Sequence, residues 1–237
     1  LVGYGASMVT LYYLRRYIVF CIDLFEKLAE KEITLSESVF DLFGAIKKTL
    51  DQFKGLLTKS ITNRERREIL DSLGQAGSEH RQKIYETAGL GKRRSLRIFD
   101  LVSFLETGLA YVDHTIQSNK RHDNLYHSYN LINITETGEI SIRHMYEMLE
   151  GQVAVLSSGY LSNTDAMLLI RSVRTSALYR EDQFSYMLYP DRSLKRFIAK
   201  NIIPPNLVAH SALLKRFLKN GDTSVVIRDE LGAVRFN

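Results

Sequence analysis

Apolar residues recur at helical spacing along the first half of the chain. Residues 6–30 carry a broad apolar stripe, and comparable stripes follow from Val39 to Phe53 and in residues 95–119, with a further helix expected between Thr62 and Glu86. Apolar residues three and four positions apart lie on one side of a helix. The pattern therefore predicts long helices in this half, packed against one another as antiparallel helical hairpins.

Three pairs of residues fit the capping box that opens a helix. In this motif a hydroxyl accepts the backbone N–H three residues later, and the side chain of that residue reaches back to the first N–H. The pairs are Thr34 with Glu37, Thr62 with Glu65, and Ser162 with Asp165. They predict helices that begin close to these residues.

The pattern changes after residue 122, where aromatic and β-branched residues become frequent. "LYHSYNLINI" predicts a short extended segment near 125–134, and "TETGE" after it has turn chemistry. Helical spacing returns at about 142–157 and 163–178, and again in two short amphipathic segments, 193–200 and 211–219. The final "TSVVIRDELGAVRFN" predicts a β-hairpin that turns at "DELG".

These patterns together predict a mainly α fold of antiparallel helical hairpins. The exceptions are the extended segment near 125–134 and the C-terminal β-hairpin. We expect a single mainly helical domain over residues 1–237, with an internal division near 120–124. Because the chain starts on Leu1 and stops within a predicted strand, we also expect it to be a fragment of a longer chain.

Composition adds few constraints. Of the 237 residues, 45% are hydrophobic and 25% charged, which is typical of a globular protein, and the net charge is +5. The single cysteine, Cys21, has no disulfide partner, and we expect a small buried hydrophobe. No membrane span is expected, because Arg15 and Arg16 interrupt the longest apolar stretch. No signal peptide is evident; localisation is undetermined, with a cytoplasmic location favoured.

Sequence motifs exclude several classes of enzyme. The chain has no phosphate-cradling glycine loop, dinucleotide fingerprint, metalloprotease histidine pair or nucleophile elbow, so no nucleotide or metal cofactor is predicted. Clusters such as "GKRRSLR" and "LLKRFLK" are basic, but mixed charges and amphipathic spacing favour a solvated surface. We therefore do not expect a nucleic acid partner.

The stretch "HDNLYHSYN", residues 122–130, gathers side chains that bind metals, hold sugars or move protons. On a strand, Asp123, His127 and Tyr129 would lie on one face and Tyr126 on the other. His122 and His127 would then point in opposite directions, which disfavours a shared metal. Polar packing within the helical array is one interpretation, and a ligand-facing loop is the other.

Two further segments carry candidate chemistry. Glu150 lies in a helix that is apolar nearly all round, where a carboxylate acts as a general acid, binds a ligand or pairs with an arginine. The segment 182–192 combines acids, an amide and aromatic residues outside a helix. Aromatic rings stack on pyranose faces, and carboxylates hold the hydroxyls. Glycoside cleavage also requires two carboxyls about 5–9.5 Å apart, a distance that sequence spacing does not give.

Three stretches, "NKRHDNLYHSYNL", "YEMLEGQVAVLSSGYLS" and "DQFSYMLYPDRSLKRFIAKNIIP", resemble an internal segment of very large bacterial proteins. Their helical hairpins are similar to the (α/α)6 toroids of carbohydrate-active enzymes, such as glycoside hydrolases and phosphorylases. No catalytic motif of those enzymes matches residue by residue. The resemblance implies a partial α/α-toroid-like array of helices. It also implies two partners, a carbohydrate ligand and the remaining parts of the parent chain.

Under this hypothesis the chain is a fragment of a bacterial glycan-handling protein, and its candidate catalytic acids are Asp123, Glu150, Asp182 and Asp191. The residues expected to line the site are Tyr126, His127, Gln183, Tyr186, Tyr189 and Arg192. The alternative is a non-catalytic helical scaffold or interaction module, in which the same residues would pair in internal hydrogen bonds.

Overall fold

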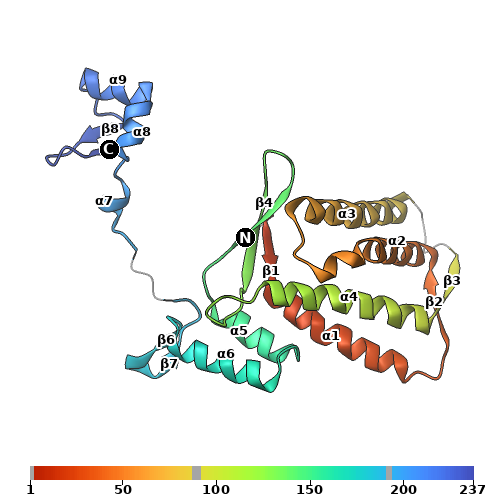
Figure 1. Ribbon diagram of the computed structural model, residues 1–237. Coiled ribbons are helices and arrows are strands. Elements are labelled where there is room, and N and C mark those ends of the chain that lie inside the picture. The colour runs from red at the N-terminus through yellow and green to blue at the C-terminus, as the bar shows by residue number, and fades with distance from the viewer. Residues whose placement is uncertain (1–2, 87–91, 191–193) are drawn as a thin grey trace. The chain divides into compact units, whose positions relative to one another are not determined.

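The computed structural model describes residues 3–86, 92–190 and 194–237 (Figure 1). By its internal contacts the chain divides into two compact units, unit 1 (Leu1–Asp191) and unit 2 (Arg192–Asn237). The segment 120–124 lies within unit 1. A single domain divided near that segment stays a prediction.

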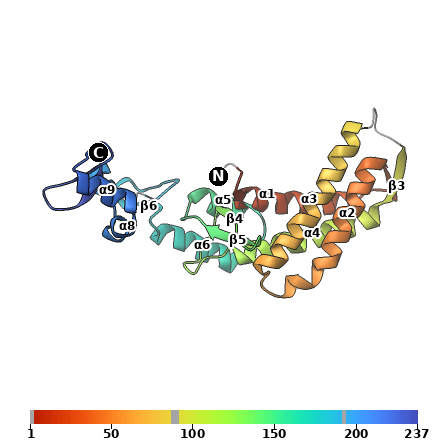
Figure 2. The same ribbon diagram turned by 90° about the horizontal axis from the view of Figure 1, so that it is seen from above.

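Unit 1 is built mainly from helices, as the hydrophobic spacing predicts. The α-helices are α1 (Met8–Glu26), α2 (Glu37–Phe53), α3 (Asn63–Glu86), α4 (Ile98–Ser118), α5 (Leu149–Ser157) and α6 (Asn163–Thr175). Two 3-10 turns are η1 (Lys54–Thr58) and η2 (Glu181–Gln183). In Figure 1 α1 lies along α4 and α2 along α3, and in Figure 2 the α2–α3 pair lies at a steep angle to α1.

The main core of unit 1 lies where α1, α4, α5 and α6 meet the loop after α4. Tyr12 and Ile116 are fully buried there, together with Val155 and Leu169. The Tyr12 hydroxyl donates a hydrogen bond of 2.7 Å to the backbone oxygen of His127, so the loop is tied to α1 from inside the core. Cys21 is buried, as expected.

A small antiparallel sheet confirms the extended segment near 125–134. Its strands are ordered β1 (Gly5–Ser7), β4 (Tyr129–Ile134) and β5 (Ile140–His144). Two further antiparallel pairs in unit 1 are β2 (Glu32–Ser36) with β3 (Arg93–Arg97), and β6 (Tyr179–Arg180) with β7 (Ser185–Tyr186).

Two predicted helix starts are wrong. In both cases the residues expected to begin the helix belong to a paired β-strand instead. Thr34 lies in β2 opposite Ser95, so it does not cap α2, which begins at Glu37. Residues 140–144 form β5 rather than the start of a helix, because Ile140 and Ile142 pair with isoleucines of β4. The helix predicted from 142 begins only at Leu149.

The Thr62–Glu65 capping box is confirmed in full, and at Ser162–Asp165 the hydroxyl cap is confirmed. The Glu65 N–H donates to the Thr62 hydroxyl at 3.2 Å, and the Glu65 carboxylate accepts the Thr62 N–H at 2.8 Å. This backbone hydrogen bond from Thr62, with that from the Lys59 side chain, lowers the pKa of Glu65 to about 2. At α6 the Ser162 hydroxyl accepts the Asp165 N–H at 3.1 Å.

Unit 2 contains short helices and the predicted C-terminal β-hairpin. The helices are α7 (Phe197–Lys200), α8 (Pro205–His210) and α9 (Ala212–Asn220), and the hairpin is β8 (Val226–Arg228) with β9 (Val234–Phe236). Its small core contains Ile203, Val226 and Val234. Among the described residues of both units, no helix is long and apolar enough to cross a membrane.

Candidate functional site

The stretch 122–130 connects α4 to the sheet and is folded tightly. The Arg121 N–H donates to the Leu125 oxygen at 2.8 Å, and Asn124 adopts a left-handed backbone with φ of 62°. Asparagine tolerates this conformation better than most residues. The turn allows Leu125 and Tyr126 to be buried, so the predicted site residue Tyr126 belongs to the core.

Gln152 holds the backbone of this stretch against α5. Its carbonyl oxygen accepts the Tyr126 N–H at 2.8 Å, and its amide donates to the Tyr126 and Met148 oxygens, each at 2.8 Å. The Gln152 side chain is fully buried, so these bonds satisfy polar groups that water does not reach.

Ser128 provides the cap of α5 that the local sequence lacks. The residue before the helix, Met148, has no side-chain acceptor, and instead the Gly151 N–H donates to the Ser128 hydroxyl at 3.0 Å. The same hydroxyl donates to the Met148 oxygen at 3.2 Å. The first N–H of α5, that of Leu149, donates to the Leu188 oxygen at 3.0 Å. Distant segments therefore fix where α5 begins.

Five residues around this junction form what we call the polar cluster: Arg121, Asp123, His127, His144 and Glu147. The Arg121 guanidinium donates hydrogen bonds of 2.8–3.2 Å to both carboxylate oxygens of Asp123. It also forms an ion pair with Glu147 at 3.4 Å. The hydrogen bond from Arg121 lowers the pKa of Asp123, so this carboxyl is ionised at neutral pH.

Within the polar cluster, the imidazoles of His127 and His144 stack face to face with ring centroids 4.0 Å apart. Burial, the neighbouring His144 and the Arg121 charge lower the pKa of His127 to about 4. Burial also lowers the pKa of His144. Both rings are therefore neutral near pH 7. Among the described residues, no group of three or more His, Cys, Asp or Glu side chains is placed to hold a metal.

A second set of residues, which we call the aromatic–acid group, consists of Tyr129, Glu150 and Tyr189. Burial raises the pKa of Tyr129, as do a hydrogen bond with the Glu150 carboxylate and the nearby Tyr189. None of the described basic side chains forms an ion pair with Glu150. Tyr189 is 46% exposed and Glu150 is partly exposed, so both side chains are accessible to a ligand.

The other predicted site residues are placed differently. Asp182 pairs with Arg180 at 2.7 Å on the β6–β7 hairpin, and this hydrogen bond lowers its pKa. Gln183 is exposed on the same hairpin, where Tyr186 packs against Tyr179 with ring centroids 5.2 Å apart. Asp191 and Arg192 lie outside the described residues.

Sequence reasoning missed the residues that organise the site: Arg121, Ser128, His144 and Glu147. Each acts on a partner that its own local pattern does not identify, such as Ser128 on the first turn of α5. Gln152 could have been identified from the sequence, because an amide within an otherwise apolar helix needs hydrogen-bond partners inside the protein.

Comparison with known proteins bears on unit 2 directly. Residues 194–237 match the family described as GH149 phosphorylase insertion domain 2. Among curated proteins, none matches the sequence. The family match supports the resemblance of the chain to an internal segment of a larger protein of the glycoside hydrolase and phosphorylase type.

Proposed function

We propose that the chain is a segment of a bacterial glycan-handling protein of the phosphorylase type and that the aromatic–acid group of unit 1 binds carbohydrate. The match of residues 194–237 to a phosphorylase insertion domain carries this proposal. In it, the helical hairpins belong to an α/α-toroid-like array of the larger protein.

The chemistry of the aromatic–acid group supports a binding role. The Tyr189 ring offers a face for a pyranose, and the Glu150 carboxylate accepts hydrogen bonds from sugar hydroxyls. A general acid, by contrast, needs a raised pKa. Asp123 and Asp182 have lowered pKa values because each is held by an arginine. We therefore assign these two acids to structure and Glu150 to ligand binding.

Replacing Tyr189 by alanine is expected to weaken oligosaccharide binding about tenfold, because the stacking face is lost while the buried network remains. The measurement is calorimetric titration of the chain with gluco-oligosaccharides of several linkages. The matched control is Tyr85→Ala, which removes an exposed tyrosine from the end of α3. Absence of binding to every oligosaccharide, or equal binding by the Tyr189 variant, would contradict the proposal.

A second candidate function, a helical interaction module, is favoured by the free face of α1. Tyr13, Tyr17, Phe20 and Leu24 are each between 44% and 63% exposed. Their spacing of four, three and four residues is that of a coiled-coil seam. Large exposed apolar stripes mark interaction sites.

If α1 is an interaction surface, the isolated chain should associate through it as its concentration rises. The double substitution Tyr17→Glu and Phe20→Glu is expected to keep the chain monomeric without loss of helix content. Sedimentation velocity measures the association and circular dichroism the helix content. Tyr85→Glu is the control, and association that persists in the double variant would exclude this surface.

A further inference from the structure

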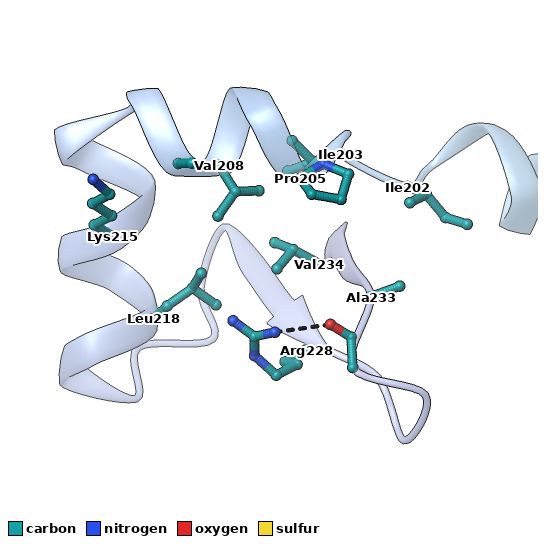
Figure 3. Close-up of a pocket in the computed structure, with 11 residues that line it drawn as sticks. Ile202, Ile203, Pro205, Val208, Lys215, Leu218, Arg228, Ala233 and Val234 are labelled. Carbon is teal, nitrogen blue, oxygen red and sulfur yellow. Dashed lines mark hydrogen bonds between the residues drawn. The ribbon is translucent and has the colours of Figure 1, made fainter.

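Unit 2 contains a pocket that is lined only by residues of that unit. It has a volume of about 410 Å³, is open to solvent, and is lined by residues of α8, α9 and the β8–β9 hairpin (Figure 3). Ligand pockets are typically about 300–1,000 Å³ and mostly apolar. The pocket is therefore large enough for a small ligand. All the residues that line it lie within the 44 residues that match the family, 194–237.

Aliphatic side chains form most of the wall. They come from three parts of unit 2: the segment before α8, the helices α8 and α9, and the β8–β9 hairpin. Those labelled in Figure 3 are Ile202, Ile203, Pro205, Val208, Leu218, Ala233 and Val234. A sugar ring would leave its hydroxyls without partners against such a wall. The ligand must therefore have an apolar body.

The charged residues that line the pocket are both cations, Lys215 from α9 and Arg228 from β8. Arg228 donates one hydrogen bond, of 2.8 Å, to the Gly232 oxygen at the hairpin turn, which Figure 3 draws. No carboxylate among the described residues pairs with either cation. The remaining donors of both side chains are available to an anion.

The charge of the whole unit adds to this preference. Residues 194–237 contain eight lysines and arginines but three aspartates and glutamates, so they carry the whole net charge of +5 of the chain. The nearby carboxylate of Asp229 is already paired with Arg235. The local field therefore attracts anions and repels cations.

We propose that this pocket binds a small amphipathic anion, with an alkyl or aryl body against the aliphatic wall and a carboxylate attracted by the cations that line the pocket, Lys215 and Arg228. The inference does not depend on carbohydrate binding by unit 1. The two sites share no residue, so either proposal can fail while the other stands.

The test uses the full 237-residue chain and octanoate as the probe, at concentrations below micelle formation. Calorimetry is expected to show one octanoate bound per chain, and no binding of octyltrimethylammonium, which has the same chain and the opposite charge. Lys215→Gln should weaken octanoate binding about tenfold, the effect of losing one charge-assisted hydrogen bond. Lys219→Gln is the matched control, because Lys219 is on α9 but does not line the pocket.

A second variant separates filling of the pocket from loss of charge. Ala209→Phe adds bulk at an exposed position of α8 that lines the pocket, so it should block octanoate while leaving the core of unit 2 intact. The proposal would be overturned if the Lys215 and Ala209 variants both bound octanoate as tightly as the unsubstituted chain does. Binding of octyltrimethylammonium as tight as that of octanoate would also overturn it, as would inorganic phosphate binding as tightly as octanoate.

Discussion

Gly151→Ala is expected to destabilise unit 1 by about 2–3 kcal/mol, the usual cost of overpacking a closed interior site. A Cβ at this position would overlap the Ser128 hydroxyl and would lie 2.9 Å from the Ser128 Cα and Cβ. Ser128 cannot retreat, because its hydroxyl is bonded to both Gly151 and Met148. Urea unfolding followed by circular dichroism measures the change.

The matched control for this substitution is Gly44→Ala. Gly44 also lies in a helix, α2, but no atom lies within 4 Å of the position that its Cβ would take. Alanine there should raise the free energy of unfolding by up to about 1 kcal/mol, because it is the better helix former. Equal effects of the two substitutions would show that Ser128 does not hold the start of α5.

Gln152→Met should lower the free energy of unfolding by about 3 kcal/mol, since it leaves buried polar groups without partners. Methionine has a similar volume but cannot accept the Tyr126 N–H or donate to its oxygen. The cost therefore measures the hydrogen bonds rather than a cavity. Hydrogen exchange of the Tyr126 amide should accelerate in parallel.

Gln75→Met provides the comparison, because Gln75 is exposed on α3 and bonds only to Glu79 among the described residues. A change within about 0.5 kcal/mol is expected there. If Gln152→Met changes the free energy of unfolding equally little, the 122–130 stretch does not depend on the hydrogen bonds between Gln152 and Tyr126.

Features that depend only on residues a few positions apart, such as helix caps and hairpin turns, could be predicted from the sequence. Thr62 with Glu65 forms a capping box wherever the following residues are helical, and the "DELG" hairpin depends on its own turn. Thr34 with Glu37 has the same local pattern, yet Thr34 pairs with Ser95, 61 positions away. Sheet pairing at long range overrode the local signal.

The candidate site was predictable only in part, for the same physical reason. The aromatic and acidic composition identified Tyr189 and Glu150 as candidates, but no spacing shows that Tyr129 joins them. The stacked partner of His127, His144, is on β5, in a segment whose helical spacing predicts a helix. The site is assembled by the return of the chain from β5 into α5.

The most direct test of carbohydrate binding at the aromatic–acid group is an NMR titration of the chain labelled with ¹³C in its tyrosine rings. Single Tyr→Phe variants assign the resonances of Tyr129, Tyr189 and Tyr85. Addition of the gluco-oligosaccharide that binds in calorimetry should shift the Tyr129 and Tyr189 resonances saturably and leave Tyr85 unchanged. Shifts confined to other tyrosines, or no shift at saturation, would contradict the assignment of this site.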